Sequence, residues 1–238
     1  MHQLTFETAQ KILLEQYSKN NILQELRAFL KKSFPSAGPI LVVGGFLRDT
    51  LRGADIMHRD IDITIGNIAP DVLFGLPGAE CNFFGGIELL YQGQSVDIWP
   101  LQETYHIKKF QLPATIEGFL AGAPFNLDKI VFDIGAGQLY EDGCVAGLAE
   151  KKIVYCPARP YLEHIQAARA ILLQQKTDFS LDESVIALFR RASGKLQNSK
   201  TLTAEVCDYI YRLKQFKNRG ECMKIVEKII YYNAVSNN

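Results

Sequence analysis

The sequence predicts an α+β fold, in which a head with a mixed β-sheet and flanking helices is followed by a short all-helical extension. Short apolar runs with strand periodicity lie between residues 40 and 133, separated by glycine-rich turns. After Pro157 only helical spacing of apolar residues is found. We therefore expect the head over residues 1–157, with N-terminal helices at about 4–34, and a neck-like helical extension over residues 158–238.

Composition and charge narrow the class of protein. Of the 238 residues 47% are hydrophobic and 22% are charged, which is ample for a core and excludes a disordered chain. No apolar run approaches the roughly 18 residues of a membrane span, and the N-terminus lacks a charged segment followed by an apolar core. We expect a cytoplasmic protein without a membrane partner.

The net charge of zero hides two halves of opposite sign. Up to Glu150 there are 11 Lys and Arg against 18 Asp and Glu, and after it there are 15 against 8. This division suits an acidic metal-binding part joined to a basic part that faces phosphates. Attraction between two oppositely charged halves is the alternative explanation.

The first elements follow from periodicity and breakers. Helical spacing over 4–34 predicts one or two helices, and the apolar run 40–43 predicts a buried strand. Gly44-Gly45 ends that strand before a helix that runs through Leu51. The alternation of Asp and Ile or Thr over 60–65 then predicts a second strand.

The later elements are shorter in the head and longer in the extension. Strands are expected at 81–84, 87–91, 95–99, 127–133 and 152–155, and the second and third of these should pair as a hairpin. The extension should contain helices at 161–175, 182–192, 202–216 and 221–232.

Two aspartates on one predicted strand form the candidate metal site. Side chains alternate along a strand, so Asp60 and Asp62 emerge on one face. Oxygen ligands at this spacing suit Mg²⁺ or Mn²⁺, with water and substrate phosphates completing the coordination. An isolated Asp-x-Asp is more often a solvated strand face. Here the strand is otherwise apolar, so two adjacent like charges would be costly without a cation.

Asp97 supplies the third carboxylate that two-metal phosphoryl chemistry usually needs. It alternates out of phase with Val96 and Ile98 on a neighbouring predicted strand. Its side chain can therefore point the same way as the Asp60 and Asp62 pair.

The glycine pair between strand and helix is a candidate phosphate site. Gly44 and Gly45 allow close approach of the backbone to a ligand, and N–H groups at a helix start attract anions. A plain turn is the commoner meaning of such a pair. Arg48 could neutralise phosphates or could pair with Asp49 and fix the helix, and the sequence leaves both open.

An ordered set of these residues resembles a known family signature. The pattern G-G-x-x-R-D-x-L-x-G followed by D-x-D is typical of the head of poly(A) polymerases and CCA-adding enzymes, within the DNA polymerase β-like nucleotidyltransferases. It is matched by Gly44, Gly45, Arg48, Asp49, Leu51, Gly53, Asp60 and Asp62. The resemblance spans about residues 38–180 and is strong in the first thirty.

The resemblance implies a metal-dependent nucleotidyltransferase. Such an enzyme moves a nucleoside monophosphate from an NTP such as ATP to a hydroxyl acceptor, for example an RNA 3′ end in RNA processing, and releases pyrophosphate. The catalytic and metal-binding residues would be Asp60, Asp62 and Asp97, and nucleotide binding would fall to Gly44, Gly45, Arg48 and Asp49. A non-catalytic nucleotide- or RNA-binding module that keeps the fold is the alternative.

The chain departs from the family at the positions that, in the family, help to hold the sugar of the nucleotide and to select its base. Gly122-Ala123-Pro124 replaces the family's Arg-Arg-Asp, and the neck element E-D-x-x-R is reduced to Glu163, Gln166 and Arg169. Basic residues that could contact the acceptor RNA are Arg169, Arg190, Arg191, Lys214 and Lys217. A solvated helix face explains these residues nearly as well.

Overall fold

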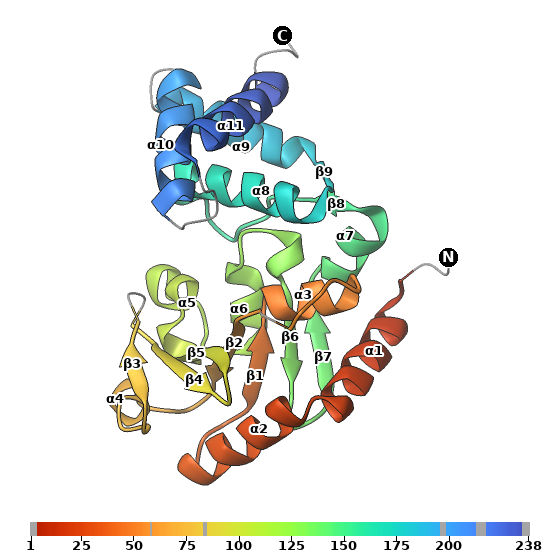
Figure 1. Ribbon diagram of the computed structural model, residues 1–238, viewed down its shortest axis with the longest axis vertical. Coiled ribbons are helices and arrows are strands. Elements are labelled where there is room, and N and C mark those ends of the chain that lie inside the picture. The colour runs from red at the N-terminus through yellow and green to blue at the C-terminus, as the bar shows by residue number, and fades with distance from the viewer. Residues whose placement is uncertain (1–3, 58, 83–84, 196–198, 213–217, 235–238) are drawn as a thin grey trace. The chain divides into compact units, whose positions relative to one another are not determined.

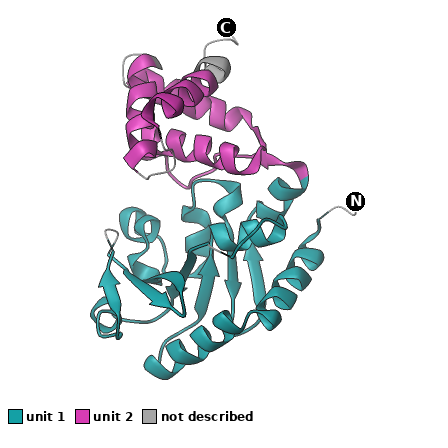
Figure 2. Cartoon of the chain, in the orientation of Figure 1, with its two compact units in different colours: residues 1–149 teal, residues 150–238 magenta. Residues whose placement is uncertain are grey.

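A computed structural model describes residues 4–57, 59–82, 85–195, 199–212 and 218–234. The chain divides into two compact units, Met1–Ala149 and Glu150–Asn238 (Figure 2). The sequence suggested a boundary at residue 157, whereas the structure divides eight residues earlier.

Seven strands of the first unit form one mixed sheet, in the order β3-β4-β5-β2-β1-β6-β7 (Figure 1). The strands are β1 (Ile40–Val43), β2 (Ile61–Ile65), β3 (Ala79–Cys81), β4 (Ile87–Tyr91), β5 (Gln94–Pro100), β6 (Ile130–Asp133) and β7 (Gln138–Glu141). Strands β2 and β5 run parallel, and the other neighbours in this sheet are antiparallel. The α+β class and the β4–β5 hairpin predicted from the sequence are confirmed.

The helices of this unit differ greatly in length. They are α1 (Phe6–Lys19), α2 (Asn21–Ser33), α3 (Gly45–Leu51), α4 (Pro70–Leu73), α5 (Tyr105–Phe110), α6 (Ile116–Gly122) and α7 (Cys144–Glu150), with 3-10 turns at Leu101–Glu103 and Asn126–Asp128. The Asn20 side chain caps α2 by accepting the Leu23 N–H at 3.0 Å. The sequence missed α4 to α7 because four to seven residues are too few to display helical periodicity.

Helices α1 and α2 cover one face of the sheet. This face carries alternate residues of each strand, among them Ile63, Ile98 and Phe132, which are all buried. The ring centroid of Tyr17 on α1 lies 6.2 Å from that of Phe132. The central strands are therefore fixed in register by their apolar side chains, since a slip of one residue would turn these side chains outward.

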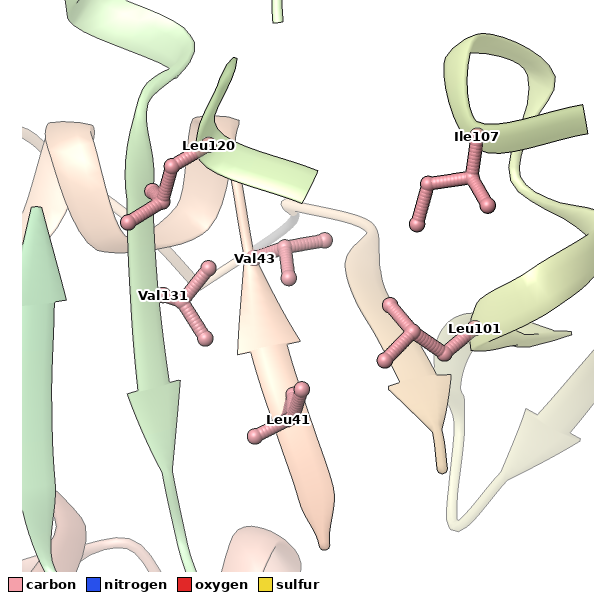
Figure 3. Packing of buried hydrophobic residues seen from close by; sticks show 6 residues of the cluster. All are labelled: Leu41, Val43, Leu101, Ile107, Leu120 and Val131. Carbon is pink, nitrogen blue, oxygen red and sulfur yellow. The ribbon is translucent and has the colours of Figure 1, made fainter. Parts of the chain in front are cut away.

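The opposite face is covered in part by α5 and α6 (Figure 3). Its packed apolar residues are Leu41, Val43, Leu101, Ile107, Leu120 and Val131. Val43 lies directly opposite Asp62 in the β1–β2 ladder, so this apolar cluster and the candidate carboxylates share one face of the sheet.

The second unit is helical but contains a small parallel ladder. Its elements are β8 (Lys152–Ile153), α8 (Glu163–Thr177), β9 (Ser180–Leu181), α9 (Glu183–Lys195), α10 (Ser199–Arg212) and α11 (Arg219–Ala234). The helical extension expected from the sequence is observed, and it additionally contains the two residues of β9, which pair with β8. Because this ladder joins residues 152–153 to the chain after α8, they belong to the second unit and move the boundary toward the N-terminus.

Buried apolar residues from all four helices form the core of this unit. Examples are Ile171 on α8, Phe189 on α9, Val206 on α10 and Val226 on α11, each without measurable exposure. Within the described residues, every helix is too short or too polar to cross a membrane.

Candidate active site

The central strands bring two of the predicted carboxylates together. Asp62 on β2 lies directly opposite Asp97 on β5 in the parallel ladder, and both are half-buried. Asp60 is exposed and immediately precedes β2, so it lies one residue outside the strand in which it was expected. The structure thus places Asp62 and Asp97 on one face, with Asp60 in the residue before β2.

The glycine turn lies beside Asp62. Gly44 has φ 68° and ψ −129°, a conformation that residues with a side chain rarely adopt. A Cβ atom added to Gly44 would lie 3.7 Å from Asp62 Oδ2. The Gly44 N–H donates to the Ile130 carbonyl oxygen at 3.3 Å, so this N–H is already engaged. The backbone N–H groups that the helix itself leaves for another acceptor therefore begin at Gly45, in the first turn of α3.

Burial and neighbouring charges raise the pKa of Asp97. Burial is the largest cause, the hydrogen bond from Asn82 opposes it, and the carboxylates of Glu88 and Asp60 add to it. Glu88 lies opposite Asp97 in the β4–β5 ladder. The Asp97 carboxylate is thus surrounded by negative charge, which is the condition that a bound cation would relieve.

These carboxylates fit a divalent cation as a partial set of ligands. Among the described residues, no group of three or more His, Cys, Asp or Glu side chains is arranged to hold a metal ion. Mg²⁺ commonly takes only one or two carboxylates, with waters and substrate phosphates as the rest. Asp62 and Asp97 in register, with Asp60 nearby, meet that smaller requirement.

Arg48 and Asp49 belong to a buried ion-pair network. Arg48 donates from Nε to Asp49 Oδ1 at 3.2 Å and from Nη1 to Asp128 Oδ1 at 3.0 Å. Asp49 also pairs with Arg52 at 3.1 Å and with Arg59 at 2.5 Å, and its side chain is fully buried. The structure therefore favours the pairing role that the sequence left open for Arg48, and it buries Asp49 away from any nucleotide.

Two of the five basic residues predicted to contact the acceptor form ion pairs with acidic side chains. Arg190 pairs with Glu183 at 3.0 Å, and Arg191 pairs with Glu163 at 2.8 Å. Arg169 is half-buried within the second unit. Lys214 and Lys217 lie outside the described residues.

Sequence reasoning missed three residues around the site. Asn82 donates to Asp97 Oδ1 at 3.1 Å, Glu88 faces Asp97, and Arg59 ties the segment before Asp60 to the buried Asp49. Glu88 could have been predicted as a neighbour of Asp97, because it alternates with Ile87 and Leu89 in the predicted hairpin and so points to the opposite face from them. Asn82 and Arg59 lie in irregular segments whose contacts no periodicity predicts.

Comparison with solved structures identifies the fold. The chain superposes on the Thermotoga maritima CCA-adding enzyme complexed with tRNA with a TM-score of 0.64 and 21% identity, over 94% of this chain and 55% of that chain. A CCA-adding enzyme in complex with ATP gives a TM-score of 0.65 and 22% identity, over 90% and 52%. A tRNA-processing enzyme in an apo form gives a TM-score of 0.64 and 16% identity, over 92% of this chain and 59% of that chain.

The fold is therefore that of the CCA-adding nucleotidyltransferases, and the resemblance to the head of that family is confirmed at the level of the fold. The chain spans little more than half the length of these solved structures. No model of a protein family matches the sequence, and no curated protein matches it either.

Proposed function

We propose that this chain is a metal-dependent nucleotidyltransferase that transfers a nucleoside monophosphate from an NTP to a hydroxyl acceptor. The observation that carries the proposal is the pair Asp62 and Asp97, opposite each other on parallel strands, with Asp62 beside the Gly44 turn. The fold shared with CCA-adding enzymes, two of which are complexed with ATP and CTP, supports it.

Asp60, Asp62 and Asp97 are the residues that would hold Mg²⁺ or Mn²⁺. A bound divalent cation supplies stabilisation of the charge that develops on the attacking and leaving oxygens. The N–H groups at Gly45 and the start of α3 bind the phosphates, and Arg48 ties α3 to the 3-10 turn Asn126–Asp128 through its ion pair with Asp128.

The reaction forms a bond between the acceptor hydroxyl oxygen and the α-phosphorus. The bond from that phosphorus to the bridging oxygen breaks, pyrophosphate leaves, and the hydroxyl proton passes to solvent. The protein contributes mainly position and charge, because phosphoryl transfer requires little other chemistry from side chains.

The test of the site is Asp62→Asn. We expect pyrophosphate release with Mg²⁺ to fall by about 100-fold or more, since stabilisation by the cation is worth several kcal/mol. The melting temperature should stay close to that of the wild type, because removing one of two adjacent like charges does not destabilise the strand. Asp71→Asn, an exposed aspartate on α4, is the matched control and should leave turnover unchanged.

Two outcomes would contradict this assignment. Unchanged turnover in Asp62→Asn would exclude Asp62 from the site. Tight NTP binding by the wild type without turnover on any acceptor would indicate a non-catalytic nucleotide-binding module.

We further propose RNA as the acceptor, bound through the basic second half of the chain. The charge of residues after Glu150 supports this, as does the fold shared with enzymes that are complexed with tRNA or process it. Arg190 and Arg191 would exchange their present carboxylate partners, Glu183 and Glu163, for phosphates.

Salt dependence tests the RNA proposal. For single strands the log–log salt slope changes by about 0.7 for each phosphate that the protein no longer neutralises. Replacing Arg190, Arg191, Lys214 and Lys217 by Ala should flatten that slope and leave NTP binding unchanged. Replacing four lysines of α1 and α2 (Lys11, Lys19, Lys31 and Lys32) by Ala removes the same charge and should leave the slope unchanged. An equal slope in both variants would show that the basic residues form only a solvated surface.

A further inference from the structure

The turn between β3 and β4 lies against the strand that carries Asp97. Asn82 donates its backbone N–H to the Gly86 carbonyl oxygen at 3.0 Å, and its side-chain Oδ1 accepts the Gly86 N–H at 2.9 Å. A Cβ atom added to Gly86 would overlap the Trp99 ring and lie 2.6 Å from the Ile98 carbonyl oxygen. Only glycine allows the turn to approach β5 this closely.

This arrangement fixes the orientation of the Asn82 amide. Its oxygen is the atom that accepts the Gly86 N–H, so its NH₂ group must be the end that faces Asp97. That group donates to Asp97 Oδ1 at 3.1 Å. Asn82 is thus bonded on one side to the turn and on the other to the carboxylate.

The bond leaves the second oxygen of Asp97 for another ligand. An ionised carboxylate accepts hydrogen bonds on both oxygens, and Asn82 occupies one of them. Asp97 has Asp62 opposite it on β2 and Glu88 opposite it on β4. Without a donor, repulsion from these acidic neighbours would favour rotation of the Asp97 side chain away from the Asp62 position.

We propose that Asn82 is a positioning residue, which holds the Asp97 carboxylate in the orientation that binds a divalent cation together with Asp62. The inference rests on the proposed function. Ligating carboxylates are commonly hydrogen-bonded by a second residue, and loss of that residue costs about 10-fold to 100-fold in metal affinity. Asn82 therefore acts through Asp97 and does not touch the substrate.

The experiment measures Mn²⁺ affinity without turnover. The dissociation constant for Mn²⁺ is determined from the electron paramagnetic resonance of the free ion, on the full chain with a non-hydrolysable NTP analogue. We expect Asn82→Ala to raise this constant about 10-fold. In an Asp97→Asn background the same substitution should change it less than about twofold, because the residue through which Asn82 acts has already been altered.

Two variants separate positioning from closure of the turn. Asn82→Ser keeps a hydroxyl that can accept the Gly86 N–H but is too short to reach Asp97, so it should weaken Mn²⁺ binding while it retains the melting temperature. Asn20→Ala is the control, because the Asn20 side chain likewise accepts a backbone N–H, that of Leu23 in α2. It should lower the melting temperature and leave Mn²⁺ affinity unchanged.

The outcomes distinguish this inference from the function on which it rests. Wild-type affinity in Asn82→Ser, or an equal loss from Asn82→Ala with and without Asp97, would reduce Asn82 to a residue that closes the turn. No saturable Mn²⁺ binding by the wild type would overturn the proposed metal site and this inference with it.

Discussion

Asp49 and Asp97 lie in the same unit, and the protein treats their charges in opposite ways. Asp49 is fully buried and contacts three arginines, Arg48, Arg52 and Arg59. Asp97 is half-buried, receives one neutral hydrogen bond from Asn82, and among the described residues forms no ion pair with a lysine or arginine. Asp49 belongs to the G-G-x-x-R-D part of the family signature, and Asp97 lies on a later strand that pairs with the strand of Asp62.

The difference separates a structural carboxylate from one suited to a ligand. A buried charge that is matched by arginines contributes to the fold, and its removal leaves its partners uncompensated. A carboxylate among other carboxylates carries a cost that the fold itself does not offset. Such a cost is typical of sites that bind a cation, and the contrast therefore supports the proposal that Asp97 is a metal ligand while Asp49 stabilises the fold.

The largest effect is expected from Asp49→Ala. The buried Arg48 guanidinium would keep only Asp128, and we expect a loss of about 3 kcal/mol in the free energy of unfolding, at the lower end for a broken buried ion pair. Urea denaturation measures this loss. Asp71→Ala, at an exposed position, should change the free energy by less than about 0.5 kcal/mol. Equal stabilities would mean that the arginine network does not support the fold.

An intermediate effect is expected from Glu163→Gln in the second unit. Burial acts to raise the pKa of Glu163, but Lys195 and Arg191 outweigh it and lower the pKa below the ordinary value. A lowered pKa stabilises the folded protein above the ordinary glutamate pKa, and this contribution is lost as the pH falls through the folded pKa.

The Glu163→Gln variant should thus lose about 1 kcal/mol of the free energy of unfolding at pH 7. The loss is small because both cationic partners, Arg191 and Lys195, are well exposed to solvent, which screens the interaction. The difference from the wild type should vanish in strong acid. Thermal unfolding from pH 7 to pH 2 checks this prediction, and a constant difference across the range would contradict it.

The smallest effect has the opposite sign and comes from Asp97→Asn. Because the pKa of Asp97 is raised, the folded protein loses stability as the pH rises from the ordinary aspartate pKa to the folded one. With divalent cations removed by a chelator, the variant should melt about 2 °C higher than the wild type at pH 7. The two should melt together below the ordinary aspartate pKa. A lower melting temperature at pH 7 would place Asp97 with Asp49 as a structural carboxylate.

The sequence predicted the elements with clear periodicity and missed those without it. Alternation in β2 and β5 placed Asp62 and Asp97 on one face, and the ladder between these strands agrees. No local pattern could reveal that Asp49 is enclosed by three arginines, because Arg59 approaches it from a segment outside α3. The roles of the aspartates in metal binding and catalysis stay predictions.

The hydrogen bond from Gly44 to Ile130 bears on the order in which the site can assemble during synthesis. All three aspartates have been synthesised by residue 97, but the glycine turn acquires its bond only when β6 joins β1. A nascent chain that ends before residue 130 therefore carries all three aspartates of the candidate site, but its Gly44 turn lacks this hydrogen bond. Interactions between residues so distant in sequence form late, because closing a long loop costs entropy before the interaction can offset it.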